Sequence, residues 1–534
     1  MINATMATKP KLPIGIQSFA KLRSGGFAYV DKTPFIARMA SEAGAFFLSR
    51  PRRFGKSLLV DTLDCAFSGK RELFEGLYLD RPESGWDWTK THPVIRIDFA
   101  EGSPDNPTEF KARLHSLIDR WTEQWGVRTT KGSPGMRLAD LVRAIHAVTG
   151  KHVVVLADEY DKPILDSLSN LADAIETREI LRDFYGVLKP LDEHLRFVLL
   201  TGVSKFSKAG IFSGLNNLRD ITLSDSFSAI CGYTETDLDT VFAQHCDGLD
   251  RDMIRRWYNG YSWGGEGVYN PFDILLLFEE RRFHPWWFET GTPTFLVKLL
   301  REQPRTLPDL DSLWIGSELS DSVEPDSMRF EAVLFQTGYL TIKERTNDAI
   351  RGERYRLGFP NLEVRSAFSR LFVETFSGTA AVVSNQRELL WTALEHGDAE
   401  ALRNVFHAFF AGIPHDWYRN NPIRQYEGFY CSVVYGYFAS LGLDVIPEDT
   451  TNKGRVDLTV KAPWGIWLFE FKVQGLDRSL ASDRDPLEQL KSRGYAEKYK
   501  IGGPGNPAGV PVRLVGVVFD PETRNLDAWS VEEL

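Results

Sequence analysis

The stretch FLSRPRRFGKSLLVDTL, residues 47–63, decides the expected fold of the first part of the chain. Its second half, Gly55-Lys56-Ser57, ends the pattern G-x-x-x-x-G-K-[ST], in which backbone N–H groups and a lysine surround a phosphate and a hydroxyl reaches a magnesium ion. Arg50 stands where that pattern has its first glycine. Because this glycine mainly eases the geometry at the start of the loop, we expect Arg50 to change the approach to the loop more than its chemistry. An apolar strand before the loop and a helical pattern after it predict a phosphate site at the start of the helix.

Apolar runs alternate with helical patterns from residue 12 to residue 225, which is typical of βαβ units on a parallel sheet. The strand candidates are AFFLS, PVIRIDFA, HVVVLADE and RFVLLTGV. The last three end in or next to a polar residue or glycine, and open α/β sheets bind their ligands at these carboxyl ends. We therefore predict an α/β domain with its chemistry at one edge of a parallel sheet.

Two acidic residues follow the buried strand pattern VVVLA. We expect Asp158 to hold magnesium through water and Glu159 to polarise an attacking water. Thr201 ends the next strand and is a candidate sensor of the γ-phosphate. The alternatives are that Ser57 caps an ordinary helix and that the other three residues simply end their strands.

The loop also carries three arginines, Arg50, Arg52 and Arg53. They are candidates to stabilise negative charge at a phosphate, to contact nucleic acid, or to contact an acidic lid, and the sequence does not choose between these roles. Arg53 is the one we assign to nucleotide binding.

The remaining chain is expected to form three further parts. Residues 226–300 are helical and aromatic, with helix starts at Thr234 and Asn270, and resemble a small lid. Residues 301–415 begin with a stretch rich in Pro, Ser and Asp and continue as a helix-rich linker. In the last part, residues 416–534, the patterns predict a helix, two strands, a second helix and a final strand, at residues 426–442, 454–462, 465–473, 485–500 and 512–520.

The two strands of this last part form a candidate catalytic hairpin. Alternation places Asp457 on one face of the first strand and places Glu470 and Lys472 on one face of the second. Two carboxylates with a lysine suit a magnesium-dependent phosphodiesterase, because carboxylates bind the hard cation and the lysine acts on water and developing charge. The alternative is an amphipathic hairpin with a solvated Glu–Lys pair.

Residues on the flanking helices extend this candidate site. Glu427 is a candidate third carboxylate, and Gln489 with Arg493 is placed to touch a phosphate backbone. The second helix also carries lysines and tyrosines that predict a local nucleic-acid patch, the alternative being a solvated face: Lys491, Tyr495, Lys498, Tyr499 and Lys500.

Composition limits the remaining possibilities. The chain has 534 residues, enough for roughly two to four domains. Its formal net charge of -10 means that any nucleic-acid binding must come from local basic patches. The four cysteines contain no C-x-x-C pair, and the chain has neither a signal-like apolar segment nor a membrane-spanning run, so we expect a cytoplasmic protein.

Several of these stretches together resemble the bacterial AAA-ATPase-like family: SRPRRFGKSLL, LADEYDKP, TGVSKFSKAGIFSGLNNLRDIT, WYNGYSW and YNPFDILLLF. In that family the arginine-rich loop is the usual form of the Walker A motif. The C-terminal helix, hairpin and helix, with GRVDL and FEFK, resemble a PD-(D/E)XK nuclease superfamily domain. Val456-Asp457 stands where the superfamily's name has proline-aspartate.

The resemblance implies an architecture and a function. The architecture is a P-loop NTPase domain with helical lid, a helical linker and a restriction-endonuclease-like α/β domain. Lys56, Ser57, Asp158 and Glu159 would bind and hydrolyse ATP with Mg²⁺. Asp457, Glu470 and Lys472 would cut nucleic acid, with DNA the expected partner in defence or DNA processing. The alternative is a nucleotide-dependent switch with a silent nuclease-like domain. A homo-oligomer is left open, and no membrane association is expected.

Overall fold

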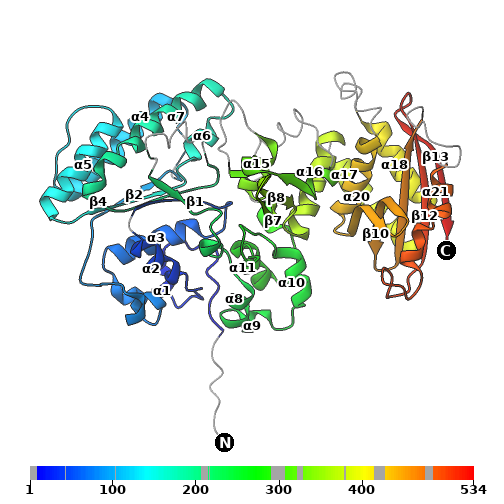
Figure 1. Ribbon diagram of the computed structural model, residues 1–534, viewed down its shortest axis with the longest axis horizontal. Coiled ribbons are helices and arrows are strands. Elements are labelled where there is room, and N and C mark those ends of the chain that lie inside the picture. Colours follow the sequence, from blue (N-terminus) through cyan, green and yellow to red (C-terminus); the bar gives the residue numbers. More distant parts are fainter. Residues whose placement is uncertain are drawn as a thin grey trace, which may run out of the picture. The chain divides into compact units, whose positions relative to one another are not determined.

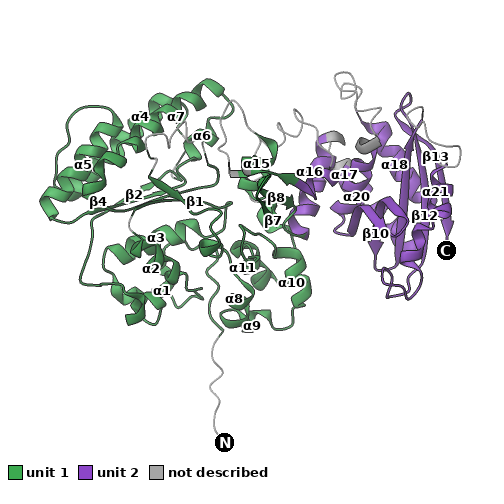
Figure 2. Ribbon diagram, in the orientation of Figure 1, with its two compact units in different colours: residues 1–295, 314–361 green, residues 296–313, 362–534 purple. Residues whose placement is uncertain are grey.

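The computed structural model describes residues 9–42, 44–100, 102, 104–205, 215, 217–289, 307–320, 329–377, 380–413, 427–474 and 485–534. The chain divides into two compact units, which Figure 2 shows in different colours. Unit 1 comprises residues 1–295 and 314–361, and unit 2 comprises residues 296–313 and 362–534. Each unit therefore combines two separate stretches of the chain.

Unit 1 is built on a five-stranded sheet in the order β2-β3-β4-β1-β5, with parallel pairing throughout. Its strands are β1 (Gly44–Ser49), β2 (Val94–Asp98), β3 (Val153–Asp158), β4 (Leu195–Gly202) and β5 (Leu218–Asp220). All six residues of β3 are buried, as expected for a parallel strand covered on both faces. The first four strands lie where the apolar runs predicted them, and the short strand β5 was not predicted.

Helices cover both faces of this sheet. They are α1 (Phe19–Ser24), α2 (Thr33–Ser41), α3 (Lys56–Phe67), α4 (Pro107–Trp125), α5 (Pro134–Thr149), α6 (Lys162–Asp166) and α7 (Leu171–Gly186). Figure 1 shows α4, α5 and α7 on one side of the sheet and α1, α2 and α3 on the other. Residues before α4 and α5 explain where these helices begin, because the side chains of Asn106 and Ser133 cap their first turns and proline follows each cap.

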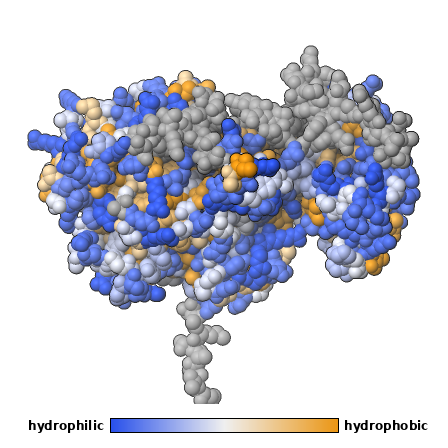
Figure 3. All heavy atoms as spheres, viewed as in Figure 1, coloured by the Kyte–Doolittle hydropathy of each residue, from blue (hydrophilic) through white to orange (hydrophobic). Residues whose placement is uncertain are grey.

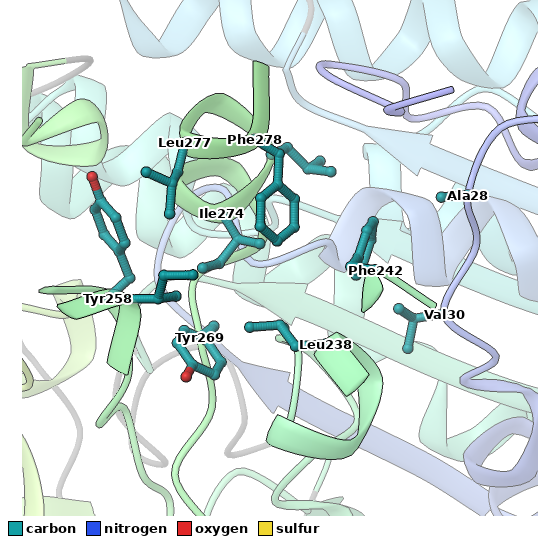
Figure 4. Close-up of a cluster of buried hydrophobic side chains, with 11 residues drawn as sticks. Ala28, Val30, Leu238, Phe242, Tyr258, Tyr269, Ile274, Leu277 and Phe278 are labelled. Atoms are coloured by element: carbon teal, nitrogen blue, oxygen red, sulfur yellow. The ribbon is translucent and has the colours of Figure 1, made fainter. Parts of the chain in front are cut away.

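A group of short helices follows the sheet: α8 (Glu235–Thr240), α9 (Ala243–Cys246), α10 (Arg251–Tyr258), α11 (Pro271–Glu280) and α12 (Trp286–Glu289). Thr234 and Asn270 cap α8 and α11, as the sequence predicted. Figure 4 shows the apolar core of this region, in which Leu238, Phe242 and Phe278 pack together with Val30 from the N-terminal segment.

Unit 1 is completed by α15 (Phe330–Thr337) and by the antiparallel hairpin of β7 (Thr341–Asp348) and β8 (Gly352–Gly358). Strand β6 (Leu313–Ile315) pairs with β8, which gives the sheet order β6-β8-β7. The sequence predicted a helix-rich region here and missed these strands. In β7 the residues that follow Thr341 and Ile342 are charged or polar, so this strand lacks the alternation of apolar and polar residues that marks a strand.

Unit 2 contains a second five-stranded sheet in the order β13-β12-β11-β10-β9. Its strands are β9 (Asp444–Thr451), β10 (Gly454–Ala462), β11 (Gly465–Val473), β12 (Val512–Asp520) and β13 (Asn525–Glu533). Only β11 and β12 pair in parallel. The helices are α14 (Leu307–Leu310), α16 (Leu362–Ser377), α17 (Ala380–His396), α18 (Ala399–Gly412), α20 (Glu427–Ser440) and α21 (Pro486–Ser492).

Unit 2 differs from the prediction at its edges and in its last helix. Strands β9 and β13 were not predicted. The helix expected over residues 485–500 ends at Ser492, because Gly494 has a left-handed backbone with φ of 62°. The chain continues as a 3₁₀ helix, Tyr495–Tyr499. The other described 3₁₀ helices, elsewhere in the chain, span Arg71–Phe74, Tyr78–Asp80, Pro82–Ser84, Lys189–His194, Asp225–Phe227 and Ser317–Ser320.

The surface agrees with the composition. On the face shown in Figure 3, hydrophilic residues predominate over the described parts of the chain, and apolar residues are scattered among them. Among the described residues, no helix combines the length and the apolar character needed to span a bilayer.

Candidate nucleotide-binding and metal-binding sites

The predicted phosphate loop connects β1 to α3. Gly55 precedes the first residue of α3 and has a φ of 91°, a conformation that favours glycine over residues with a side chain. Among the described residues no side chain caps this helix start, and its first turn contains no acidic residue. The N-terminus of α3, which begins at Lys56-Ser57, is thus available to an anion, and the local geometry fits a phosphate.

Lys56 lies inside this loop. Its Nζ donates hydrogen bonds to the carbonyl oxygens of Arg50, at 2.8 Å, and Pro51, at 2.9 Å. Burial lowers the pKa of the Lys56 ammonium group, and the nearby carboxylates of Asp158 and Glu159 act in the opposite direction. Sheet order explains this proximity, because β4 is the only strand between β1 and β3. The lysine and the two acids that the sequence predicted are therefore brought together.

Arg50, which replaces the first glycine, is a buried residue with 1% of its surface exposed. Its guanidinium donates to the carbonyl oxygens of Thr222, at 3.0 Å, and Phe227, at 3.1 Å, and its Cζ lies 4.1 Å from the centre of the Trp263 ring. Burial lowers the pKa of Arg50 to about 10. Arg50 thus anchors the start of the loop to residues far along the chain. Arg53 differs, since it is exposed and its Cζ lies 4.6 Å from the centre of the Phe272 ring.

The acidic residues lie at the carboxyl end of β3. The Thr201 hydroxyl donates to Asp158 Oδ1 at 2.6 Å, which joins the predicted sensor to the predicted magnesium-binding acid. Glu159 has a left-handed backbone with φ of 51°. Burial raises the pKa of the Glu159 carboxyl, and the ammonium group of Lys56 lowers it. Asp158, Glu159 and Thr201 thus lie together at the carboxyl ends of β3 and β4, the edge at which the sequence predicted the chemistry.

Asp161 is a further acidic residue of this region, and its role was not predicted. It is 1% exposed and accepts hydrogen bonds from the backbone N–H groups of Val203, at 3.1 Å, and Ser204, at 2.6 Å. It therefore ties the loop after β3 to the loop after β4. The sequence feature that could have indicated Asp161 is its position as the third acidic residue of the motif ADEYD.

The second candidate site lies on the β10–β11 hairpin. The strands pair in antiparallel register with Leu458 opposite Phe469, joined through residues 463 and 464. Asp457 Oδ2 accepts a hydrogen bond from the backbone N–H of Phe471 at 2.7 Å. The two predicted carboxylates are neighbours, because the charge of Asp457 raises the pKa of Glu470.

Glu470 is the most enclosed carboxylate of the hairpin, with 2% of its surface exposed. Its Oε1 lies 3.5 Å from Lys472 Nζ and accepts a hydrogen bond from the side-chain amide of Gln489. Its Oε2 accepts no hydrogen bond from the described residues. Burial raises the pKa of Glu470, and the neighbouring Asp457 raises it further.

Asp457 is also held in an unfavourable environment for its charge. Burial raises the pKa of Asp457, while the Phe471 N–H and the Lys472 ammonium lower it. Glu448 on β9 contributes to the increase and has a left-handed backbone with φ of 48°. Glu448 was not a predicted site residue, because strand β9 was not predicted. Its carboxylate also forms an ion pair with Arg455, at 2.9 Å.

These observations fit a divalent cation at the hairpin. Two enclosed carboxylates, one with an oxygen lacking a partner among the described residues, favour the binding of a positive charge. Within the described part of the chain, no cluster of three or more His, Cys, Asp or Glu side chains is arranged to hold a metal. The side chain of Glu427, the predicted third carboxylate, lies outside the described residues.

The predicted basic and aromatic patch on the last helix is only partly exposed, since its lysines Lys491 and Lys500 lie on the surface and its tyrosines do not. Tyr495 and Tyr499 are buried, at 5% and 0% exposure, because the chain turns at Gly494 and packs them into the core. Lys498 is paired with Asp449 at 2.5 Å, and Lys491 is paired with Glu488 and Glu532. The side-chain amide of Gln489 donates a hydrogen bond to Glu470.

Comparisons with known proteins assign a family to each of the two regions that carry these candidate sites. Residues 13–212 match the family described as Predicted AAA-ATPase, and residues 425–529 match the PD-(D/E)XK nuclease superfamily. The chain is 47% identical over 529 residues to a protein of Azotobacter chroococcum mcd 1 named "Uncharacterized protein in vnfD 5'region". That alignment covers 99% of this chain and 100% of the relative.

Proposed function

Since the chain belongs to the predicted AAA-ATPase family and carries a C-terminal domain of the PD-(D/E)XK nuclease superfamily, we propose that it is an ATP-controlled nuclease that cuts DNA. Its parts in this proposal are an ATPase core at 12–225, a lid at 226–300, a linking region at 301–415 and a nuclease domain at 416–534. The proposal places it in the cytoplasm, in defence against foreign DNA or in DNA processing.

The nucleotide half of the proposal is supported by the contacts around Lys56. In it, the lysine binds the β- and γ-phosphates of ATP, Ser57 and Asp158 hold Mg²⁺, and Thr201 detects the γ-phosphate. Arg53, at the mouth of the loop, is proposed to contact the nucleotide. Glu159 is proposed to orient the attacking water, because its carboxylate lies beside the lysine at the end of β3.

The nuclease half is supported chiefly by the enclosed carboxylate of Glu470, whose second oxygen has no partner in the described residues. We propose that Asp457 and Glu470 hold a magnesium ion, with Glu427 as a third ligand. When bound, the ion would stabilise negative charge on the phosphate that is being cleaved. Lys472, as an ammonium group, would orient the attacking water and offset the negative charge that develops on the phosphate. Gln489 would fix the orientation of Glu470 through their hydrogen bond.

One observation favours the alternative function, a nucleotide-dependent switch whose nuclease-like domain is silent. The described residues contain no metal cluster with three or more acidic, histidine or cysteine ligands. Without the contribution of Glu427, two carboxylates and the Lys472 ion pair would form a weak cation site.

Cleavage assays on the full chain distinguish these functions. Linear, supercoiled and single-stranded DNA and RNA are incubated with magnesium or manganese, and with ATP, ADP or no nucleotide. Asp457→Asn is the matched control, because asparagine retains an oxygen for the Phe471 N–H. ATP-dependent cleavage of DNA that is lost in Asp457→Asn supports the proposal. Absence of both cleavage and divalent-ion binding would replace it with the silent switch.

A further inference from the structure

A buried turn at the end of α15 lies against the phosphate loop, although it follows the matched ATPase region by more than a hundred residues. We call residues 336–339 the α15 turn. Gly338 has a φ of 92°, and Tyr339 N–H donates to the carbonyl of Leu334 at 2.8 Å, which closes the helix. Gln336 and Tyr339 are 7% and 3% exposed. The turn is therefore a fixed, enclosed part of unit 1.

Gly338 packs directly on Pro51 of the phosphate loop. A Cβ atom at position 338 would lie 2.7 Å from Pro51 Cγ and 2.8 Å from Pro51 Cβ. Carbon atoms in contact are normally about 3.5 to 4 Å apart, so even a methyl group would force the two segments to separate. Glycine thus allows the α15 turn to approach the loop this closely.

A second contact holds the next residue of the loop. The Trp287 Nε1–H of α12 donates to the carbonyl of Arg52 at 3.1 Å. The Trp287 ring lies 5.4 Å from the ring of Tyr339, between centres. Consecutive residues of the phosphate loop, Pro51 and Arg52, are therefore held by one assembly of α12 and the α15 turn.

The same turn also contacts the strand that carries the predicted sensor. Gln336 Oε1 accepts a hydrogen bond from the backbone N–H of Lys205 at 3.0 Å. Lys205 follows β4, on which Thr201 lies, and its Nζ is paired with Asp220 at 2.5 Å. One element thus touches both loops that would face the phosphates.

Lys56 provides a reason for the loop to move when phosphate binds. Its ammonium group donates to the carbonyl oxygens of Arg50 and Pro51. An ammonium group has three donors, so a β- or γ-phosphate bound by Lys56 would share the group with these two oxygens. Binding would thus change the hydrogen bonding of Pro51 on one side while Pro51 remains packed on Gly338 on the other.

We propose that the α15 turn and Trp287 are positioning elements of the nucleotide site. When a phosphate binds, a shift of Pro51 would move the α15 turn that packs on it, and this movement would reach the β7–β8 hairpin. The hairpin follows the turn at Thr341, and Lys343 Nζ donates to the carbonyl of Pro360 at 3.0 Å. Residue 361 is the last of unit 1, and the chain continues into α16 of unit 2. This inference rests on the proposed binding of ATP by unit 1 and names the route by which that binding would control the rest of the chain.

Gly338→Ala tests the contact, with Gly352→Ala as its matched control. Gly352 also has a positive φ, 72°, but a Cβ there meets no atom within 4 Å. Both substitutions bear the same kind of backbone strain, and only the first pushes on Pro51. We expect Gly338→Ala to weaken binding of Mg²⁺ and the slowly hydrolysed analogue ATPγS at least tenfold in calorimetry, and Gly352→Ala to bind like the wild type. Equal affinities of both variants would overturn the inference.

Hydrogen exchange on the wild-type full chain provides a test that does not depend on how the variants fold. ATPγS with Mg²⁺ is expected to slow amide exchange in the phosphate loop and to change it in residues 339–358, and Lys56→Ala should remove both effects. Protection of the phosphate loop alone would overturn the inference and leave the proposed function intact. Absence of protection at the loop would overturn the nucleotide site itself and the inference with it. Trp287→Phe, which keeps a ring and loses the donor to Arg52, should reduce the change at 339–358.

Discussion

Replacing Glu470 with glutamine is expected to stabilise the metal-free C-terminal unit while it removes divalent-ion binding. The Glu470 side chain is 2% exposed, and burial and the nearby Asp457 both raise its pKa, so the folded environment disfavours its charged form. Glutamine has nearly the same shape and can still accept the hydrogen bond from Gln489. It carries no charge to repel Asp457.

The expected size of the effect follows from two opposing contributions. Each pH unit by which burial raises the pKa of a carboxyl corresponds to about 1.4 kcal/mol, which the neutral side chain recovers. The ion pair with Lys472, whose atoms are 3.5 Å apart with 16% of the lysine side chain exposed, is lost and is worth about 1 kcal/mol or less. The free energy of unfolding of this unit should therefore rise by about 1 to 3 kcal/mol near neutral pH.

The pH dependence has a defined sign. A carboxyl whose pKa is raised on folding binds its proton more tightly in the folded state than in the unfolded state. The stability of the metal-free wild type should therefore fall as pH increases above about 4.3, the unfolded value for glutamate, until the raised pKa is passed. Glu470→Gln should lack this part of the slope.

Native-state hydrogen exchange measures both effects in the full chain. Peptides from β10 and β11 are followed with a chelator at increasing urea concentrations, at mildly acidic and mildly alkaline pH, and peptides from β7 and β8 serve as an internal reference. Manganese should then raise the stability of the wild type and leave the variant unchanged. A variant that is less stable than the wild type, with the same pH slope, would identify Glu470 as an ordinary stabilising partner of Lys472 and refute the metal site.

Three further substitutions test the assigned roles. Lys56→Ala should abolish ATP binding in titration calorimetry, because Lys56 begins α3, whereas the other buried cation of the loop, Arg50, is held by the carbonyl oxygens of Thr222 and Phe227; wild-type affinity would contradict the phosphate site. Glu159→Gln should bind ATP normally and hydrolyse it on the order of a hundred times more slowly, whereas equal loss of binding and turnover would make Glu159 structural. Lys472→Met should lose cleavage and retain manganese affinity, while Asp457→Asn loses both; loss of manganese affinity in Lys472→Met would show that the lysine organises the ligands.

The strands that the sequence predicts best are those that are buried along their whole length. Strand β3 is apolar and buried over its whole length, so its sequence alone identifies it. Strand β5 has only three residues, none of them buried, and β7 exposes most of its residues after the first two. Strands β9 and β13 are the edges of their sheet, where charged and polar residues interrupt the alternation.

The candidate sites were predictable where a local motif carries the chemistry. Lys56, Asp158 and Glu470 each belong to a short pattern whose spacing implies a role. The contacts of Arg50 and Gly338 could not be predicted, because both depend on partners more than a hundred residues away. Tyr495 and Tyr499 were predicted as surface residues, because the sequence pattern predicts one long helix. The chain instead turns at Gly494, and both tyrosines are buried.

The interleaved path of the chain between the two units affects how the protein can be made. Unit 1 is complete only after residues 314–361, yet residues 296–313 belong to unit 2. During synthesis the parallel sheet would therefore leave the ribosome before the α15 turn that packs on Pro51 has been translated. Until the turn is translated, the side of the phosphate loop that packs on Gly338 stays exposed. For the same reason, a truncated chain that ends near residue 300 keeps Lys56 and lacks Gly338, so its nucleotide affinity should not be taken as that of the whole protein.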